Sequence, residues 1–465
     1  MFLRRYTLQY LRVVCLVTLC LLQAPHGQSA ARKGLFGETL VPAPEIQNEN
    51  AVDLPTVGNL TERPFFSTRR HPSIAYSDSP TTDVVAELKR KVDEGSVSLP
   101  FERRSGYLRS VMEALHVPAE SQTVVFSKTS LQSHYISPSN PRAIFFSDDV
   151  SVAFIPDAPL LEIAALDPHQ GVVFYAISQR PDERPQIVRS DSCLSCHEGH
   201  DTLDVPGMLV RSVATGTGGE TLTDLGEFVS DQRSPFEERW GGWFITGKTG
   251  SAHHMGNLML SPEAGSARSS GLPKPLASLD GKFNLEGYPS HFSDVAAVLV
   301  LNHQMKMINL LTRVGWETRV AIDQMGKSPQ DKANAERLIT SDAADLADYM
   351  LFIGEAPMPG KFESTSGFAL QFAATGPRDS RGRSLRQLDL EKRLMRYPCS
   401  YMIYSAAFDG LPDAARDAVY AKLWAVLSGK DKSRKYSSLT PDIRAAIVGI
   451  LLETKPGLPA YFKPL

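Results

Sequence analysis

The chain has 465 residues, of which 42% are hydrophobic and 22% are charged, and its formal net charge is −3. These values are ordinary for a globular protein of about two or three domains that can bury a large core without disulfides. The slightly acidic balance argues against nucleic-acid binding as a main role.

The first thirty residues have the pattern of a signal peptide. Positively charged residues are followed by an apolar stretch over 13–24, which is too short to span a bilayer, and by small residues over 27–30. We expect a signal peptide at 1–30, with an uncleaved anchor as the alternative. No later stretch is long and apolar enough to cross a membrane. The sequence therefore predicts a periplasmic or otherwise exported protein that is not an integral membrane protein after signal cleavage.

Residues 31–82 are rich in Pro, Ser, Thr and Asn and show no sustained periodicity, which predicts an extended or partly disordered linker. Residues 83–185 are expected to form an α+β region. Apolar residues at helical spacing predict short helices around 84–92 and 108–115. Runs of β-branched, aliphatic or aromatic residues predict strands at 123–127, 143–146, 150–155, 160–166 and 172–177. Turn residues separate these runs, so we expect a small antiparallel sheet.

The motif that follows carries the chemistry. Cys193 and Cys196 are separated by two residues, and His197 comes directly after the second cysteine. This is the attachment pattern for a c-type haem. Two thiols at this spacing can add to the two vinyl groups of one porphyrin, and the next imidazole can bind the iron as proximal ligand. We therefore expect residues 186–290 to be a haem c-binding region with one covalent haem c.

Two other interpretations of the cysteine pair stay open. A zinc site needs about four ligands, and a thiol redox pair needs a nucleophilic thiolate. The chain has five cysteines and no second CxxC, because Cys15 and Cys20 lie in the signal segment and Cys399 stands alone. The adjacent histidine and the export signal favour the haem. Cys399 lies in an apolar segment and is expected to be a buried, inert thiol.

Residues 291–465 are predicted to be mostly helical and to pack on the haem region. A long helix is expected over 295–319 and another around 346–353. Proline and threonine near 412 and 440 mark the starts of two more. The predicted fold class is α+β, with a small antiparallel sheet region preceding a c-type haem site and a mostly helical C-terminal third.

The second axial ligand decides much of a haem's chemistry. His303 lies in the apolar stripe of the long helix and His254 in a loop rich in Gly and aromatic residues. We give these two comparable weight as distal ligands, with an open site or another residue as the alternative; a histidine in an apolar stripe such as that around His303 is more often a core residue than a ligand. Met208 and His200 follow His197 too closely to be favoured. Arginine pairs well with propionates and indole packs on porphyrin, so four more residues are pocket candidates: Arg211, Arg239, Trp240 and Trp243. The alternative, to which we give the same weight, is that the tryptophans lie in the core and the arginines are solvated.

The chain resembles a group of exported bacterial proteins described only as cytochrome c domain-containing. The resemblance covers about residues 83–460. It is carried by the single CxxCH motif and by Val205-Pro206-Gly207, Leu209-Val210-Arg211-Ser212-Val213, Arg239-Trp240-Gly241-Gly242-Trp243, His254-Met255-Gly256-Asn257, His303-Gln304 and Arg396-Tyr397-Pro398-Cys399-Ser400-Tyr401. It implies covalent haem on Cys193 and Cys196 with His197 on the iron, and no established reaction. The chain is far longer than a small cytochrome c.

The sequence thus predicts an exported monohaem c-type protein that acts in electron transfer. A haem-dependent oxidoreductase with an open sixth site, peroxidase-like or acting on small oxyanions, is the alternative, and a haem-based gas sensor is another. Expected partners are a redox protein or a small-molecule electron donor or acceptor, and the cytochrome c maturation machinery; nucleic acid is not expected.

Overall fold

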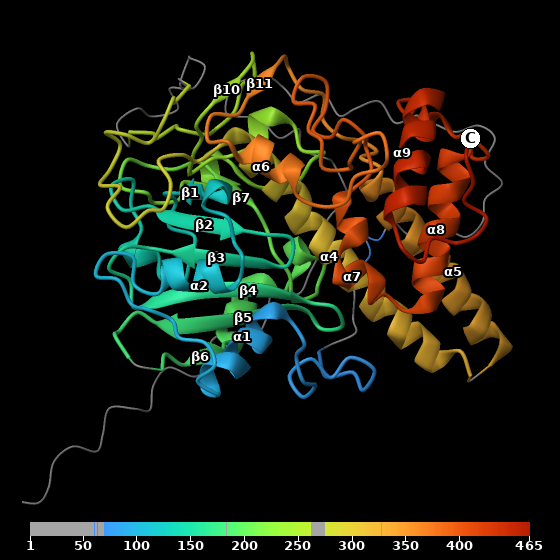
Figure 1. Ribbon diagram of the computed structural model, residues 1–465, viewed down its shortest axis with the longest axis horizontal. Helices are drawn as coiled ribbons and strands as arrows, with labels where there is room; N and C mark the ends of the chain where they lie inside the picture. Colours follow the sequence, from blue (N-terminus) through green and yellow to red (C-terminus); the bar gives the residue numbers. More distant parts are fainter. Residues whose placement is uncertain (1–59, 61–62, 64–68, 183, 262–274, 327) are drawn as a thin grey trace, which may run out of the picture.

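The computed structural model describes residues 60, 63, 69–182, 184–261, 275–326 and 328–465. The predicted signal peptide and most of the predicted linker lie outside these residues. The described part is a mixture of helix and sheet, with the sheet in the first half of the chain and the longest helices in the last third (Figure 1). This confirms the predicted mixed architecture.

A seven-stranded antiparallel sheet is built mostly from the first half of the chain. Its strands run in the order β6-β5-β4-β3-β2-β1-β9, so β1 to β6 form a meander and β9 returns to pair with β1. Short turns join β2 to β3, β3 to β4 and β4 to β5, whereas longer connections join β1 to β2 and β5 to β6. The strands are β1 (Thr123–Val125), β2 (Arg142–Phe146), β3 (Val150–Phe154), β4 (Leu160–Asp167), β5 (Gly171–Ser178), β6 (Ile187–Arg189) and β9 (Trp243–Phe244).

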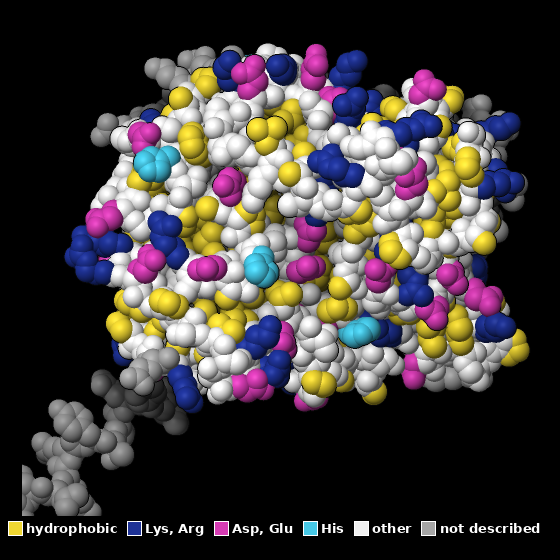
Figure 2. All heavy atoms as spheres, viewed as in Figure 1, with side chains coloured by type: hydrophobic (Ala, Val, Ile, Leu, Met, Phe, Trp, Pro, Cys, Tyr) yellow, Lys and Arg dark blue, Asp and Glu magenta, His cyan; other side chains and the backbone are white. Residues whose placement is uncertain are grey.

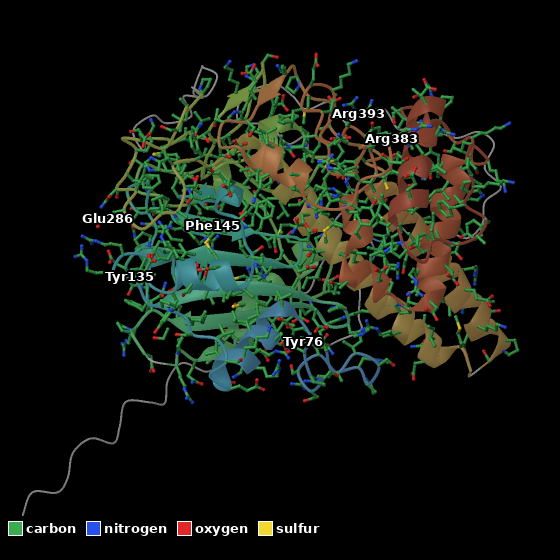
Figure 3. All side chains as sticks on the ribbon, in the orientation of Figure 1. Tyr76, Tyr135, Phe145, Glu286, Arg383 and Arg393 are labelled. Atoms are coloured by element: carbon green, nitrogen blue, oxygen red, sulfur yellow. The ribbon has the colours of Figure 1, made fainter. Side chains whose placement is uncertain are left out.

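Two short helices, α1 (Val84–Asp93) and α2 (Leu108–Ala114), pack on the sheet (Figure 1). Asp83 caps α1 by accepting bonds from two backbone amides, which satisfies donors that a helix start leaves unpaired. The chain is already folded before this helix. Tyr76, labelled in Figure 3, is buried and donates its hydroxyl proton to the carbonyl of Val172 at 2.7 Å. Folded structure therefore begins earlier than the predicted boundary at residue 83.

The helical part is built around α4 (Val295–Gln324), which is buried along most of its length and lies between the sheet and the remaining helices (Figure 1). Apolar side chains from the sheet and from these helices join in one continuous core, so the predicted regions share it. The other helices are α3 (Leu194–His197), α5 (Pro329–Met350), α6 (Phe368–Ala374), α7 (Ala406–Asp409), α8 (Asp413–Leu427) and α9 (Pro441–Thr454).

Two small antiparallel ribbons complete the fold. They pair β7 (Arg211–Val213) with β8 (Glu227–Val229) and β10 (Lys248–Thr249) with β11 (Phe362–Glu363). Across the described residues, every helix is too short or too polar to cross a bilayer. On the face in Figure 2, basic and acidic side chains are interspersed over both the sheet and the helices.

Candidate haem attachment site

The CxxCH motif occupies two short turns directly after β6. Cys193 ends a 3-10 turn (Asp191–Cys193), and Leu194–His197 forms the single-turn helix α3. Leu194 is buried and holds this turn against the core. Cys193 is half-buried, Cys196 is exposed, and neither forms a disulfide. Both thiols are therefore free for covalent attachment.

A pair of hydrogen bonds joins His197 to Gly207. The Gly207 amide donates to the His197 carbonyl at 2.9 Å, and the distance from His197 Nδ1 to the Gly207 carbonyl oxygen is also 2.9 Å. A carbonyl only accepts, so Nδ1 carries the ring proton in this contact. The lone pair is then on Nε2, and a backbone carbonyl on the other nitrogen is the usual way in which a protein orients a metal-binding histidine.

The surroundings keep His197 neutral. Its ring lies against Phe174 of β5, with 4.9 Å between ring centroids. Burial lowers the pKa of His197 to about 4, and the positive charge of Arg142 acts in the same direction, while the bond to Gly207 opposes them. Only a neutral imidazole binds a metal. The imidazole is therefore in its ligand form throughout the physiological range.

The loop from residue 199 to residue 208 brings Gly207 back beneath His197. Leu203 and Asp204 both have positive φ values, 63° and 57°, a left-handed conformation that costs free energy for residues other than glycine. Arg313 of α4 supports this turn, because its guanidinium is fully buried and donates to the Leu203 carbonyl at 2.6 Å. Arg313 is itself held by Glu317 at 2.7 Å.

Asn309, one turn earlier on α4, fixes the end of the loop. Its Oδ1 accepts from the Met208 amide at 2.8 Å, and its Nδ2 donates to the Met208 carbonyl at 2.7 Å. The same side chain leaves no room beside Gly207, where a Cβ atom would lie 2.4 Å from Asn309 Oδ1. Only glycine therefore fits at position 207, and the carbonyl of this residue is the one that orients His197.

The alternatives for the cysteine pair fit this geometry less well. A thiol redox pair needs a thiolate that is stabilised at neutral pH, whereas burial raises the pKa of the Cys193 thiol. A structural zinc ion needs about four ligands. The described residues contain no group of three or more His, Cys, Asp or Glu side chains that could hold a metal ion.

Neither predicted distal ligand presents a free nitrogen. His303 is fully buried, with Nδ1 bonded to the Gln232 side chain and Nε2 2.8 Å from Ser400 Oγ, and it stacks on Phe352. His254 receives the Gly256 amide proton on Nδ1 at 3.1 Å, and its Nε2 lies 3.3 Å from Thr249 Oγ1. Both side chains are hydrogen-bonded core residues in this structure, and their assignment as distal ligands stays a prediction.

The four predicted pocket residues are also engaged within the protein. Arg239 is buried and donates to the carbonyls of residues 232 and 234, and Trp240 is buried against α4 with its indole nitrogen bonded to Asn302. Trp243 donates to the Arg211 carbonyl, while the Arg211 side chain pairs with Glu227. Cys399 is fully buried, as expected, and burial raises the pKa of its thiol to about 12.

A cavity of about 180 Å³ adjoins the loop that follows the motif. It is lined by loop residues and by α4, and its wall includes the half-buried amine of Lys306 and the carboxylates of Asp201 and Asp231. Burial lowers the pKa of that amine, Lys306, to about 8. The polar and thioether side chains at its wall are His200, Asp201, Met208, Ser230, Asp231, Met305, Lys306 and Asn309.

No family model, no curated protein and no solved structure matches the chain. The resemblance to exported cytochrome c domain-containing proteins stays a prediction. The residues themselves fit a c-type haem: two free thiols, and a neutral histidine whose Nδ1 is occupied and whose Nε2 is available. Sequence analysis named Gly207 only within the resemblance and did not predict its role, and it missed the roles of Asn309, Phe174 and Arg142. Asn309 lies at helical spacing with the polar residues Asn302, Lys306 and Arg313, and this polar row on α4 was the one local signal that pointed to this support.

Proposed function

We propose that the chain is an exported monohaem c-type protein that acts in electron transfer, with the haem joined to Cys193 and Cys196 and its iron bound by His197. The observation that carries the proposal is the bond from His197 Nδ1 to the Gly207 carbonyl at 2.9 Å, which sets the tautomer that a proximal ligand needs. A bound haem supplies a one-electron redox centre.

The protein's own residues support this role in two ways. The clamp formed by Gly207, Asn309 and Arg313 fixes the direction in which His197 presents Nε2, and the low pKa of His197, about 4, keeps that nitrogen unprotonated. The exposed position of Cys196 places one attachment point at the surface. A redox partner protein can approach the site from that side.

An oxidoreductase or gas sensor with an open sixth site is the second candidate. The observation in its favour is that both ring nitrogens of His303 and of His254 are occupied by protein hydrogen bonds. An open iron permits binding of small molecules, whereas a second protein ligand closes it for electron transfer. Carbon monoxide added to the reduced protein separates the candidates, because only an open or readily displaced site changes its spectrum.

The primary test is covalent haem content. The full chain is produced in a host with cytochrome c maturation, and haem is measured per chain as the reduced pyridine complex after denaturation. We expect one haem c in the wild type, none in Cys193→Ala/Cys196→Ala, and one in the control Cys399→Ala, whose thiol is buried elsewhere. A wild type without haem c, or a double variant that retains it, would overturn the proposal; the former outcome brings thiol chemistry forward.

A further inference from the structure

The motif stands beside one face of the sheet whose centre is incompletely covered. Ile144, Ala153, Glu162 and Ala176 lie directly opposite one another across β2, β3, β4 and β5, so they share this face. Each is only half-buried, although these strands are internal to the sheet. On the other face, the alternating neighbours, such as Phe145 in Figure 3, are fully buried. The described residues therefore cover this strip only partly; it is apolar apart from Arg142 and Glu162, and Glu162 accepts hydrogen bonds from Ser130 and Gln132.

The motif borders this strip. Phe174, which contacts the His197 ring, lies opposite Ala164 on the same face of the sheet. Burial is the main cause of the raised pKa of Cys193 and of the lowered pKa of His197; the negative charge of Glu162 adds to the first shift and the positive charge of Arg142 to the second. Residues of β2, β4 and β5 on this face thus lie close enough to act on both the thiol and the imidazole.

Arg142 is a cation without an adequate partner. It lies on the same face as Ile144, two residues away, and its side chain is only 16% exposed. Its nearest carboxylate, Glu162, lies at 3.8 Å, which is beyond hydrogen-bond distance, and among the described residues its buried Nε has no acceptor. Buried charges are normally paired and hydrogen-bonded, because burial without a partner is costly. Among the described residues, the guanidinium thus has a carboxylate nearby but no hydrogen-bonded anion.

We propose that this strip of the sheet seats the haem ring and that Arg142 binds one of the two haem propionates. The inference rests on the proposed function. A porphyrin has flat apolar faces and carries carboxylates, so it matches an apolar strip with thiols beside it and a guanidinium on it. A guanidinium binds a carboxylate through two parallel hydrogen bonds, a geometry that an ammonium group cannot reproduce.

The experiment compares Arg142→Gln and Arg142→Lys with Arg189→Gln. Arg189 is a matched control, because it lies opposite Tyr175 on the other face of the sheet and pairs with the Tyr76 carbonyl at 2.8 Å. Each protein is made with its haem, and three quantities are measured: covalent haem per chain, reduction potential, and the propionate bending mode in the resonance Raman spectrum. Both glutamine variants lose one positive charge, so only position distinguishes them.

For Arg142→Gln we expect a lower reduction potential and a shifted propionate mode, because a cation near the haem favours the reduced state. Arg142→Lys should have a reduction potential close to that of the wild type but a shifted propionate mode. Arg189→Gln should match the wild type in both quantities. Unchanged values in both Arg142 variants, or an equal change in the control, would overturn the inference. If Arg142→Gln does not fold, the propionate mode of Arg142→Lys decides alone. Loss of haem from the wild type would instead refute the proposed function.

Discussion

The contact between Gly207 and Asn309 gives the sharpest test of how the site is held. In Gly207→Ala, the new Cβ would lie 2.4 Å from Asn309 Oδ1, 2.9 Å from its Cγ and 3.1 Å from Thr202 Cβ. Real Cβ contacts are not this short, so something must move. The carbonyl that orients His197 belongs to this same glycine. The substitution therefore probes the support of the proximal ligand without touching the motif.

The loss of folding stability in Gly207→Ala can be worked out from the two ways in which the clash can be relieved. If the side chains stay in place, overpacking costs about 1–3 kcal/mol. If Asn309 moves away, the Met208 amide and carbonyl lose their partners, each at a cost of about 1–3 kcal/mol when the group stays buried. We expect Gly207→Ala to lower the free energy of unfolding by about 2–4 kcal/mol. The same displacement should reduce the yield of covalently bound haem.

The assay is urea denaturation followed by circular dichroism, with haem per chain measured in parallel. Gly199→Ala is the matched control in the same loop, because its φ of 179° is open to any residue and a Cβ there meets no atom within 4 Å. In an Asn309→Ala background, the cost of Gly207→Ala should fall by at least half, since the clash is gone. Equal costs for the two glycine variants, or strictly additive costs in the double variant, would refute this reasoning.

Three further predictions concern buried polar groups. Arg313→Met should lower the free energy of unfolding by about 3–5 kcal/mol in urea titrations, because it leaves the buried Glu317 without one of its cations. Burial raises the pKa of Glu355 from 4.5 to about 7, so the protonated form stabilises the fold fully below pH 4.5 and that contribution is lost as the pH rises through 7. Glu355→Gln should remove this pH dependence, which is at most about 3 kcal/mol between pH 4.5 and 8, in thermal melts across that range. His303→Gln should destabilise the core by about 1–3 kcal/mol yet leave the iron spin state unchanged in the visible spectrum, because both its nitrogens bond to protein; a change to high spin would show that it reaches the iron.

The sheet was largely predictable because its signals are local. Runs of β-branched, aliphatic or aromatic residues, separated by turn residues, predicted five of its strands within a few residues of their observed bounds. The strands that were missed, β6 and β9, have three and two residues, too few to show a period. The last helices were predicted from their start signals, and α9 begins at Pro441 after the Thr440 cap, as expected. Helix α5 begins seventeen residues before the first apolar residue used to predict it, because its first half is polar and shows no stripe.

The attachment motif was predictable for the same reason, since its chemistry depends on five consecutive residues. The residues that orient the motif could not be predicted. The bond from Asn309 to Met208 spans 101 positions, and Arg142 comes from a strand about fifty residues before the motif. Pairing over such distances is set by the packing of α4 and the sheet, which no local pattern encodes. His303 shows the opposite case. The apolar stripe around it predicted a position in the core, and buried residues of the core, Gln232 and Ser400, also bond to its two ring nitrogens.

Thiol redox chemistry, zinc binding and haem attachment are the three functions open to a CxxCH sequence, and each needs different surroundings. A redox pair needs a cysteine with a lowered pKa, but desolvation raises that of Cys193. Zinc needs further ligands, which the described residues do not bring together at any site. A haem needs a neutral imidazole with one nitrogen held, an apolar surface and a counter-charge for its carboxylates. His197, the half-open sheet face and the poorly paired Arg142 meet these needs together. Arg142 is only loosely paired with Glu162, at 3.8 Å, and a carboxylate hydrogen-bonded to it would lower the cost of its burial. Among the three chemistries, the haem alone would bring carboxylates to this position.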